Sequence, residues 1–472
     1  MTQAFETLSY ILLYRMVVMC AARRASVEWA FIVVASLGGF LTLLQVSKMW
    51  MLPKIADPPD NNDNPEINAP VILWWTSSFG EDEQYKNCGD KRCYFTKKRS
   101  NAVHPLLNAI LFYGSDFEIG DLPIPRSENV RWALLHEESP RNNPMFVHKA
   151  ALELFDYSAT FSRYSDLPLT LQSLPGEKEL IGKNYYLPVK EKNKLLATKK
   201  LAPVLYIQSD CDTAIDRDSY VAELMKYIQV DSYGACLNNR LLPKSLSENY
   251  IGRLDDEEFF TFVAQYKFTL AFENAVCDDY ITEKLWRPLI VGSVPVYYGS
   301  PTFKDWLPNN TSAIAVEDFD QPKDLAEFLL KLNNDDTRYE KYLMHKLSNP
   351  EIGISNELLL NDLRSRPDDL YSVFGYSVRA FECLVCKKLH DTKMSSKMST
   401  KQYNCPLPRN MLPSERNKRN PWVHQWMLDK CAAKLLSQHV HNGTKIDVDR
   451  FTDEIFLMYE RNDCDNAVNE SS

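Results

Sequence analysis

The polar side chains best suited to chemistry gather in residues 266–299, which read YKFTLAFENAVCDDYITEKLWRPLIVGSVPVYYG. An apolar run there ends in Glu273 and Asn274, a polar loop follows, and a helix is predicted to begin near Thr282. Parallel α/β sheets bind ligands at the carboxyl ends of their strands, beside helix N-termini. The stretch therefore predicts a ligand-binding site.

Two charged residues open this predicted helix. Lys284 is suited to meet a diphosphate as a point charge, and Glu283 can accept hydrogen bonds from sugar or ribose hydroxyls. The alternative is a capped surface helix, because threonine is an ordinary N-cap and charges are common in a first turn. The residues alone leave both interpretations open.

The elements around this site alternate between strand and helix. Hydrophobic periodicity predicts strands at 204–208, 268–272 and 294–298, and helices at 217–228, 257–266 and 283–291. Such alternation implies right-handed crossovers and a parallel sheet.

The first half of the chain shows a similar pattern. Strands are predicted at 71–75, 109–113, 131–135 and 159–163, with a helical stretch near 145–155. Residues 174–200 turn polar and Lys-rich, which predicts a domain linker. Two α/β domains that face each other make a cleft. Beyond about residue 376 no regular pattern is recognisable.

Length and composition agree with this organisation. A chain of 472 residues is too long for one ordinary core. Its 45% hydrophobic and 25% charged residues are typical of folded domains. The net charge of -9 argues against a nucleic-acid binder, which needs a concentrated basic surface.

An uncharged run at residues 29–46 is just long enough to span a bilayer. The charges flanking it are Arg15, Arg23 and Arg24 before, and Asp57, Asp60 and Asp63 after. The positive-inside rule then places the N-terminus in the cytosol and the bulk of the chain in the lumen. A cleaved signal peptide is the alternative, but the run lies late and is long for one.

These features together predict six segments. They are a cytosolic tail (1–28), a transmembrane signal-anchor (29–47), a stem (48–69), an N-terminal α/β domain (70–195), a C-terminal α/β domain (196–375) and a cysteine-containing extension (376–472).

The cysteines and glycosylation sequons are consistent with a luminal location. Ten cysteines follow the predicted anchor, an even number as complete pairing requires. Cys88, Cys93, Cys383 and Cys386 are disulfide candidates, with Cys383–Cys386 read as a local disulfide rather than a zinc or redox site. N-glycosylation candidates are Asn309, Asn310, Asn442 and Asn469.

One pattern imitates a metal site. Asp210-Cys211-Asp212 follows a predicted strand and resembles the D-x-D that holds Mn²⁺ in metal-dependent glycosyltransferases. A three-residue pattern is common by chance, and Asp463-Cys464-Asp465 repeats it in the tail. We interpret both as structural.

The stretch at 266–299 resembles the signature of the α1,3-fucosyltransferases, glycosyltransferase family ten, in which F-E-N is followed by D-Y-I-T-E-K and G-S-V-P-V. The similarity runs from about residue 71 to 335. It is strongest to the divergent animal branch implicated in protein O-fucosylation, through LLHEESP (134–140), TFSRYSDLPL (160–169) and FECLVC (381–386). The resemblance implies a GT-B architecture of two Rossmann-like domains, with the acceptor side in 70–195 and the GDP-fucose-binding side in 196–375. It also implies a GDP-fucose donor, inversion at the anomeric carbon and no obligatory metal.

Residue roles follow from the same resemblance. Glu138 matches the position of the family's catalytic base, with Glu137 as the fallback. The donor contacts carried over from the family are Arg217, Asn274, Tyr280, Glu283 and Lys284. In the absence of a metal, the cations among them would meet the charge of the leaving diphosphate.

The sequence therefore predicts an inverting fucosyltransferase of the endoplasmic reticulum or Golgi membrane, single-pass type II, with its catalytic domain in the lumen. Its predicted acceptor is a Ser or Thr hydroxyl of a small disulfide-rich protein domain. Two alternatives remain: α1,3-fucosylation of N-acetylglucosamine in a glycan, and an inactive fucosyltransferase-like binding protein. No nucleic-acid partner is expected.

Overall fold

The computed structural model describes residues 67–76, 79, 83–247, 256–348, 353–366, 373–391, 397–412 and 420–464. The predicted cytosolic tail, the anchor at 29–47 and residues 48–66 of the predicted stem lie outside these ranges. Within them, no helix combines the length and apolar character needed to cross a membrane.

The first sheet has seven strands in the order β2-β3-β1-β4-β5-β6-β7. Their bounds are β1 Val71–Trp74, β2 Glu83–Cys88, β3 Lys91–Thr96, β4 Leu107–Tyr113, β5 Arg131–His136, β6 Tyr157–Thr160 and β7 Leu167–Pro168. All neighbours pair in parallel except the β2–β3 hairpin. Strand β1 is buried at every position, as expected for a parallel strand covered on both faces.

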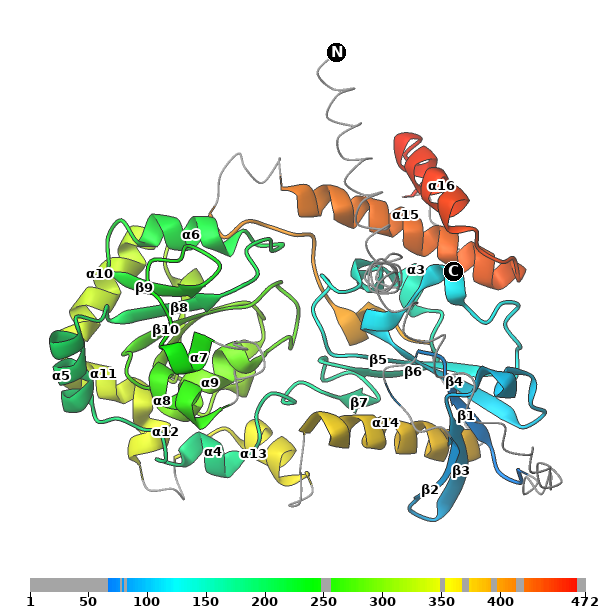
Figure 1. The fold of residues 1–472 in the computed structure, drawn as a ribbon, viewed down its shortest axis with the longest axis horizontal. Helices are drawn as coiled ribbons and strands as arrows, with labels where there is room; N and C mark the ends of the chain where they lie inside the picture. Colours follow the sequence, from blue (N-terminus) through cyan, green and yellow to red (C-terminus); the bar gives the residue numbers. More distant parts are fainter. Residues whose placement is uncertain are drawn as a thin grey trace, which may run out of the picture. The chain divides into compact units, whose positions relative to one another are not determined.

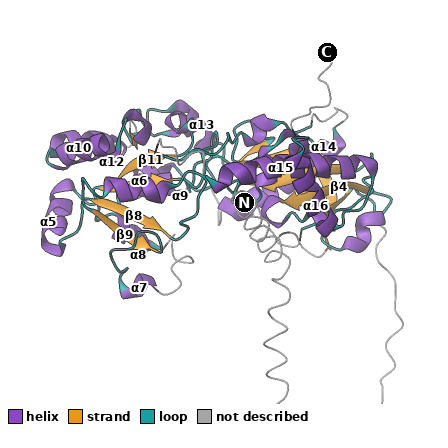
Figure 2. Cartoon of the chain, turned by 90° about the horizontal axis from the view of Figure 1, so that it is seen from above, coloured by secondary structure: helices purple, strands orange, loops and turns teal. Residues whose placement is uncertain are grey.

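The second sheet has five parallel strands in the order β12-β11-β10-β8-β9. They are β8 Val204–Gln208, β9 Val230–Gly234, β10 Phe268–Phe272, β11 Val294–Tyr298 and β12 Ile314–Ala315. The three strands predicted here have the predicted bounds. The α/β class is confirmed, and Figure 2 shows the strands of each sheet among helices.

Helices flank both sheets. In chain order they are α3 Lys149–Leu152, α4 Glu177–Ile181, α5 Val189–Lys199, α6 Arg217–Leu224, α7 Lys244–Ser247, α8 Glu257–Val263, α9 Glu283–Val291, α10 Pro322–Asn333, α11 Asp336–Glu340, α12 Met344–Leu347, α13 Glu357–Arg364, α14 Val373–His390, α15 Pro421–Asn442 and α16 Val448–Glu460. The segment predicted as a linker is structured: it forms α4 and α5, and Leu174 and Leu180 are fully buried in the second core.

The C-terminal region, for which the sequence showed no regular pattern, covers both faces of the first sheet with helices. Helix α14 buries Phe381 and Val385 against one face, and α15 with α16 buries Leu435 and Phe451 against the other (Figure 1). The chain thus forms most of the first sheet, builds the second, and returns to cover the first. Burial of each large apolar side chain contributes about 1.5–3 kcal/mol, so these helices are integral to the core.

Five disulfides join the ten cysteines, which confirms the expectation of complete pairing. The pairs are Cys88–Cys383, Cys93–Cys386, Cys211–Cys236, Cys277–Cys405 and Cys431–Cys464. The predicted local Cys383–Cys386 pair is wrong. These two residues lie three apart on α14 and therefore share one face of the helix. That face packs against the β2–β3 hairpin, which supplies both partner cysteines.

Candidate functional site

The first side of the candidate site begins where β5 ends. Glu137 and Glu138 directly follow this buried strand. Glu137 is only 6% exposed and accepts a hydrogen bond of 3.0 Å from the Tyr113 hydroxyl. Burial and the neighbouring Glu138 raise the pKa of Glu137 to about 7. Glu137 is therefore turned into the protein and engaged there.

Glu138 is more accessible than its neighbour and faces different groups. Burial raises the pKa of Glu138, Lys284 lowers it and Glu283 raises it further. A carboxylate with a raised pKa is a stronger base than an ordinary one, as proton abstraction requires. The structure thus brings Glu138 into electrostatic contact with the start of α9, far away in the sequence.

The second side begins where β10 ends. The Glu273 carboxylate is fully buried and accepts hydrogen bonds from the Thr282 backbone N–H (2.9 Å) and hydroxyl (2.7 Å). Thr282 in turn caps α9 by accepting from the Lys284 backbone N–H. The helix ends at Gly292, whose φ of 71° is the left-handed conformation that glycine adopts most easily. These contacts fix the first turn of α9.

The charges of this turn form a tight group. Lys284 Nζ lies 3.1 Å from Glu283 Oε1 and 3.8 Å from Glu273 Oε2, and its side chain is 16% exposed. Burial raises the pKa of Glu283, but Lys284 and Arg287 outweigh this effect and lower it to about 2. Glu283 therefore carries its charge at neutral pH and can accept hydrogen bonds.

Arg217 lies fully buried at the start of α6. Its Nη1 donates to the Phe272 carbonyl (2.9 Å) and to Asn274 Oδ1 (2.8 Å), and its Nη2 donates to the Asp210 carbonyl (2.7 Å). Its Nε has no hydrogen-bond partner within the described ranges. Arg217 thus holds the ends of β8 and β10 together and positions Asn274.

A cavity of about 190 Å³ joins these groups on the second side. Its lining includes Arg217, Asn274, Glu283 and Lys284, four of the five predicted donor contacts. Arg287, one turn further along α9, also lines it and was missed because nothing in the sequence distinguishes it from a surface charge. The cavity combines cations with oxygen acceptors, as a sugar diphosphate requires.

The fifth predicted contact, Tyr280, is 3% exposed and does not line this cavity. Its pKa is raised well above the ordinary value, first by burial and then by Glu273, Glu138 and Glu283. The ring also packs on Phe161, with 5.2 Å between centroids. Tyr280 therefore lies within electrostatic range of carboxylates from both sides.

The polar loop before Tyr280 holds the two sides together. The Asp279 carboxylate, 1% exposed, accepts hydrogen bonds of 2.6–2.9 Å from the Arg163 guanidinium and a further 3.0 Å bond from Trp306. Asp279 has a φ of 62°, a left-handed conformation that Asp tolerates better than most residues. Arg163 belongs to the first half, so this ion pair connects the two sheets.

A segment of the C-terminal region also crosses the site. Tyr403 is fully buried, donates to the Glu138 carbonyl at 2.7 Å and stacks on the His136 ring. Burial lowers the pKa of His136 to about 3, so this ring is neutral at physiological pH. The disulfide Cys277–Cys405 fastens the segment to the second side. No signal in the sequence linked Tyr403 to Glu138.

The D-x-D residues have protein partners. Asp210 forms an ion pair with Arg141, and Asp212 accepts a 2.8 Å hydrogen bond from Trp422. Cys211 is bonded to Cys236. Among the described residues, both clusters with the geometry of metal ligands contain disulfide-bonded cysteines, which have no thiolate to offer.

The remaining candidates are placed as follows. Asn310 and Asn442 are exposed, whereas the Asn309 side-chain oxygen accepts hydrogen bonds from Thr311 and Ser312. Asn469 lies outside the described residues. The use of these sequons stays a prediction.

Two family models match the chain. "Fucosyltransferase, N-terminal" covers residues 67–172, and "Glycosyltransferase family 10 (fucosyltransferase) C-term" covers 197–404. The matched regions contain the first and second sheets and both sides of the site.

Similar curated proteins include GDP-fucose protein O-fucosyltransferase 3 of Bos taurus, 45% identical over 402 residues, which are 82% of this chain and 83% of that protein. The protein of the same name from Danio rerio is 44% identical over 83% of this chain and 87% of its own length. That from Homo sapiens is 50% identical over 68% of this chain and 66% of its own length.

Among solved structures, "Crystal Structure of alpha1,3-Fucosyltransferase with GDP-fucose" has a TM-score of 0.41 at 15% identity, over 73% of this chain and 96% of that one. On the family models and the curated relatives, the chain belongs to glycosyltransferase family 10, the fucosyltransferases.

Proposed function

We propose that this protein transfers L-fucose from GDP-fucose to Ser or Thr hydroxyls of a folded, disulfide-rich protein. The observation that carries the proposal is that Glu138, from the first sheet, lies within electrostatic range of Glu283 and Lys284 at the start of α9 on the second. The relatives' name, GDP-fucose protein O-fucosyltransferase 3, supports both the donor and the class of acceptor.

In the proposed reaction, Glu138 removes the proton from the acceptor hydroxyl as its oxygen attacks C1 of fucose. The bond from C1 to the diphosphate oxygen breaks on the opposite face, so the anomeric configuration inverts and GDP leaves with the bonding electron pair. Lys284 and Arg217, which line the donor cavity, would stabilise the charge that develops on the diphosphate. The Glu283 carboxylate would accept hydrogen bonds from hydroxyls of the sugar or ribose, and the Asn274 amide N–H, whose oxygen already accepts from Arg217, would donate to the donor.

Glu138 suits the role of base better than Glu137. The Glu137 carboxylate is nearly inaccessible and already accepts from Tyr113, whereas Glu138 interacts electrostatically with Glu283 and Lys284. A base must reach the hydroxyl that attacks the donor. We therefore retain Glu138 as the base, and no metal is assigned to the reaction.

The same proposal includes the cellular setting. Two α/β units with a site between them support a GT-B arrangement, and five disulfides suit an oxidising compartment. The uncharged run at 29–46 and its flanking charges support a type II anchor in the endoplasmic reticulum or Golgi membrane.

The test uses the full chain, purified in detergent, with radiolabelled GDP-fucose. The acceptors are secreted proteins from cells that cannot make GDP-fucose, and an N-acetyllactosamine glycan is offered in parallel. Reductive alkaline elimination releases fucose linked directly to Ser or Thr as fucitol. We expect labelled fucitol from the proteins, and none when Glu138→Gln replaces the wild type.

Other results would contradict the proposal in distinct ways. Label only on the glycan, or on larger released oligosaccharides, would establish the alternative acceptor, N-acetylglucosamine. GDP-fucose binding without transfer to either acceptor would favour an inactive binding protein.

A further inference from the structure

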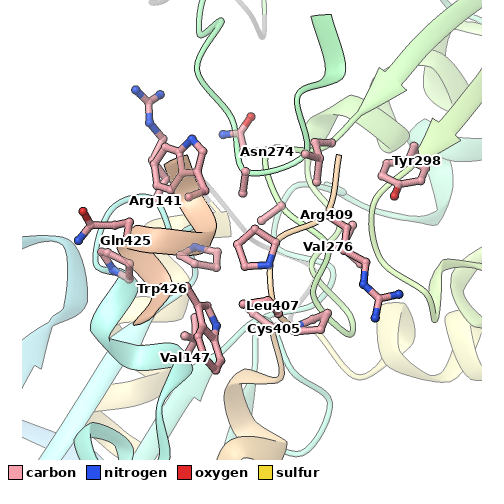
Figure 3. A pocket seen from close by; sticks show the side chains of 18 of the residues that line it. Arg141, Val147, Asn274, Val276, Tyr298, Cys405, Leu407, Arg409, Gln425 and Trp426 are labelled. Carbon is pink, nitrogen blue, oxygen red and sulfur yellow. The ribbon is translucent and has the colours of Figure 1, made fainter. Parts of the chain in front are cut away.

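A second cavity has a volume of about 290 Å³ (Figure 3). Three parts of the chain line it: residues 140–147 of the first half, residues 274–276 and Tyr298 of the second, and the C-terminal stretch represented by Leu407 and Trp426. Apart from Asn274, none of the residues assigned to the base or to the donor lines this cavity.

The second cavity adjoins the catalytic groups. Asn274 lines both cavities. Arg141, three residues after Glu138, lies on the wall of the second cavity and forms an ion pair with Asp210, which lines the donor cavity. A group bound in the second cavity would therefore lie next to the donor cavity, against the segment that follows Glu138 in the chain.

The walls of the second cavity are largely apolar. Val147, Ile215, Val276, Leu407, Trp422 and Trp426 contribute to them. Among the polar side chains at the cavity, Arg141 pairs with Asp210, Asn274 accepts from Arg217 and Gln425 donates to Asp429. Tyr298, Glu317 and Arg409 complete the polar part of the lining. Sugar hydroxyls need several free hydrogen-bonding partners when they lose water, whereas an apolar side chain needs none.

The C-terminal wall lies beyond the part of the chain that the family model matches. That match ends at residue 404, and the wall begins at Cys405 and continues into α15. This wall thus lies outside the matched region and begins two residues after Tyr403, which donates to the Glu138 carbonyl. A wall that starts so close to Glu138 is well placed to contact the acceptor.

We propose that the second cavity binds an apolar side chain of the acceptor protein, close to the hydroxyl that receives fucose. This inference rests on the proposed function. The apolar walls select a polypeptide over a free glycan, and the continuity through Asn274 places the bound residue beside the donor.

Leu407→Asp tests the proposal, because it places a charge in the apolar cavity. Leu407 is 41% exposed, so the fold tolerates the change, and Leu457 on α16, at 48% exposure, supplies a matched control as Leu457→Asp. A second variant, Leu407→Trp, fills the cavity without adding charge. The readouts are the apparent KM for the secreted acceptor proteins described above and the affinity for GDP.

We expect both Leu407 variants to raise the KM for the acceptor proteins about tenfold or more, the value of one buried apolar side chain. Their GDP affinity, and the KM of Leu457→Asp, should match the wild type. An unchanged KM, or a loss of GDP affinity in the Leu407 variants, would overturn the assignment. A raised KM for the glycan alone would do so too, because the cavity would then bind sugar. If the wild type modifies neither acceptor, the proposed function fails and this inference fails with it.

Discussion

The ion pair between Arg163 and Asp279 gives the sharpest prediction about how the two sheets are held together. Asp279 is 1% exposed and accepts from the Arg163 guanidinium, the Arg163 backbone N–H, Thr302 and Trp306. Arg163→Ala leaves a buried carboxylate without its cation. Breaking a buried pair costs about 3–5 kcal/mol. The backbone N–H of residue 163, Thr302 and Trp306 still donate to the carboxylate in this variant. We therefore expect a loss at the lower end of this range, about 3 kcal/mol in the free energy of unfolding.

The matched control is Lys304→Ala. Lys304 and its partner Asp318 are 62% and 61% exposed, so this pair is worth less than about 1 kcal/mol. Urea unfolding, followed by tryptophan fluorescence, measures both variants.

The effect of pH supplies a second readout. Burial raises the pKa of Asp279, but Arg163 and the other donors outweigh this effect and lower it below its ordinary value of 3.8. A depressed pKa contributes stability that is complete above pH 3.8 and is lost as the pH falls through the folded-state pKa. The difference between wild type and Arg163→Ala should therefore shrink in acid. Equal losses in the two variants, or a difference independent of pH, would refute this account.

Three further predictions concern the catalytic groups. The raised pKa of Glu138 places the acid limb of kcat/KM above pH 4.5, with activity rising as the base loses its proton. The pKa of Glu137 is raised to about 7, so its carboxyl is uncharged over the lower part of this limb, and Glu137→Gln should leave the limb and the transfer nearly unchanged, as a pH profile would show. A complete loss of activity in Glu137→Gln would point to Glu137 as the base. Tyr403→Phe deletes the hydrogen bond to the Glu138 carbonyl. We expect kcat to fall about fivefold, which corresponds to about 1 kcal/mol, while the KM for GDP-fucose stays constant. A change confined to KM would contradict a role of Tyr403 in positioning Glu138. Asp210 is paired with Arg141, and Asp212 accepts from Trp422. Fucose transfer should therefore continue in EDTA and gain nothing from added Mn²⁺. Loss of activity in EDTA would contradict this prediction and require a metal site.

Much of the second sheet could be predicted because its signals are local. Helix α9 begins at a threonine N-cap and ends before a glycine, and the flanking strands β10 and β11 are continuous apolar runs. Four of the predicted donor contacts line one cavity because strand ends and helix starts meet at one edge of a parallel sheet.

The parts that sequence reasoning missed depend on contacts between distant residues. Tyr403 and Glu138 are 265 residues apart, and α14 is a helix whose partner strands lie almost 300 residues earlier. An even cysteine count predicts complete pairing but not which cysteines pair, so a CxxC spacing was read as a local bond. The C-terminal helices bury their apolar faces on a sheet formed at the other end of the described chain, which local periodicity does not reveal.

The most direct test of the two-sided site is azide rescue of GDP release by Glu138→Ala. Azide has no proton to remove, so it can accept fucose without a base, provided the donor is still bound and activated. We predict that azide restores GDP release to Glu138→Ala but not to Lys284→Ala, which loses the diphosphate contact. Failure of rescue in a Glu138→Ala protein that still binds GDP-fucose, or equal rescue in both variants, would contradict the assignment of base and donor site.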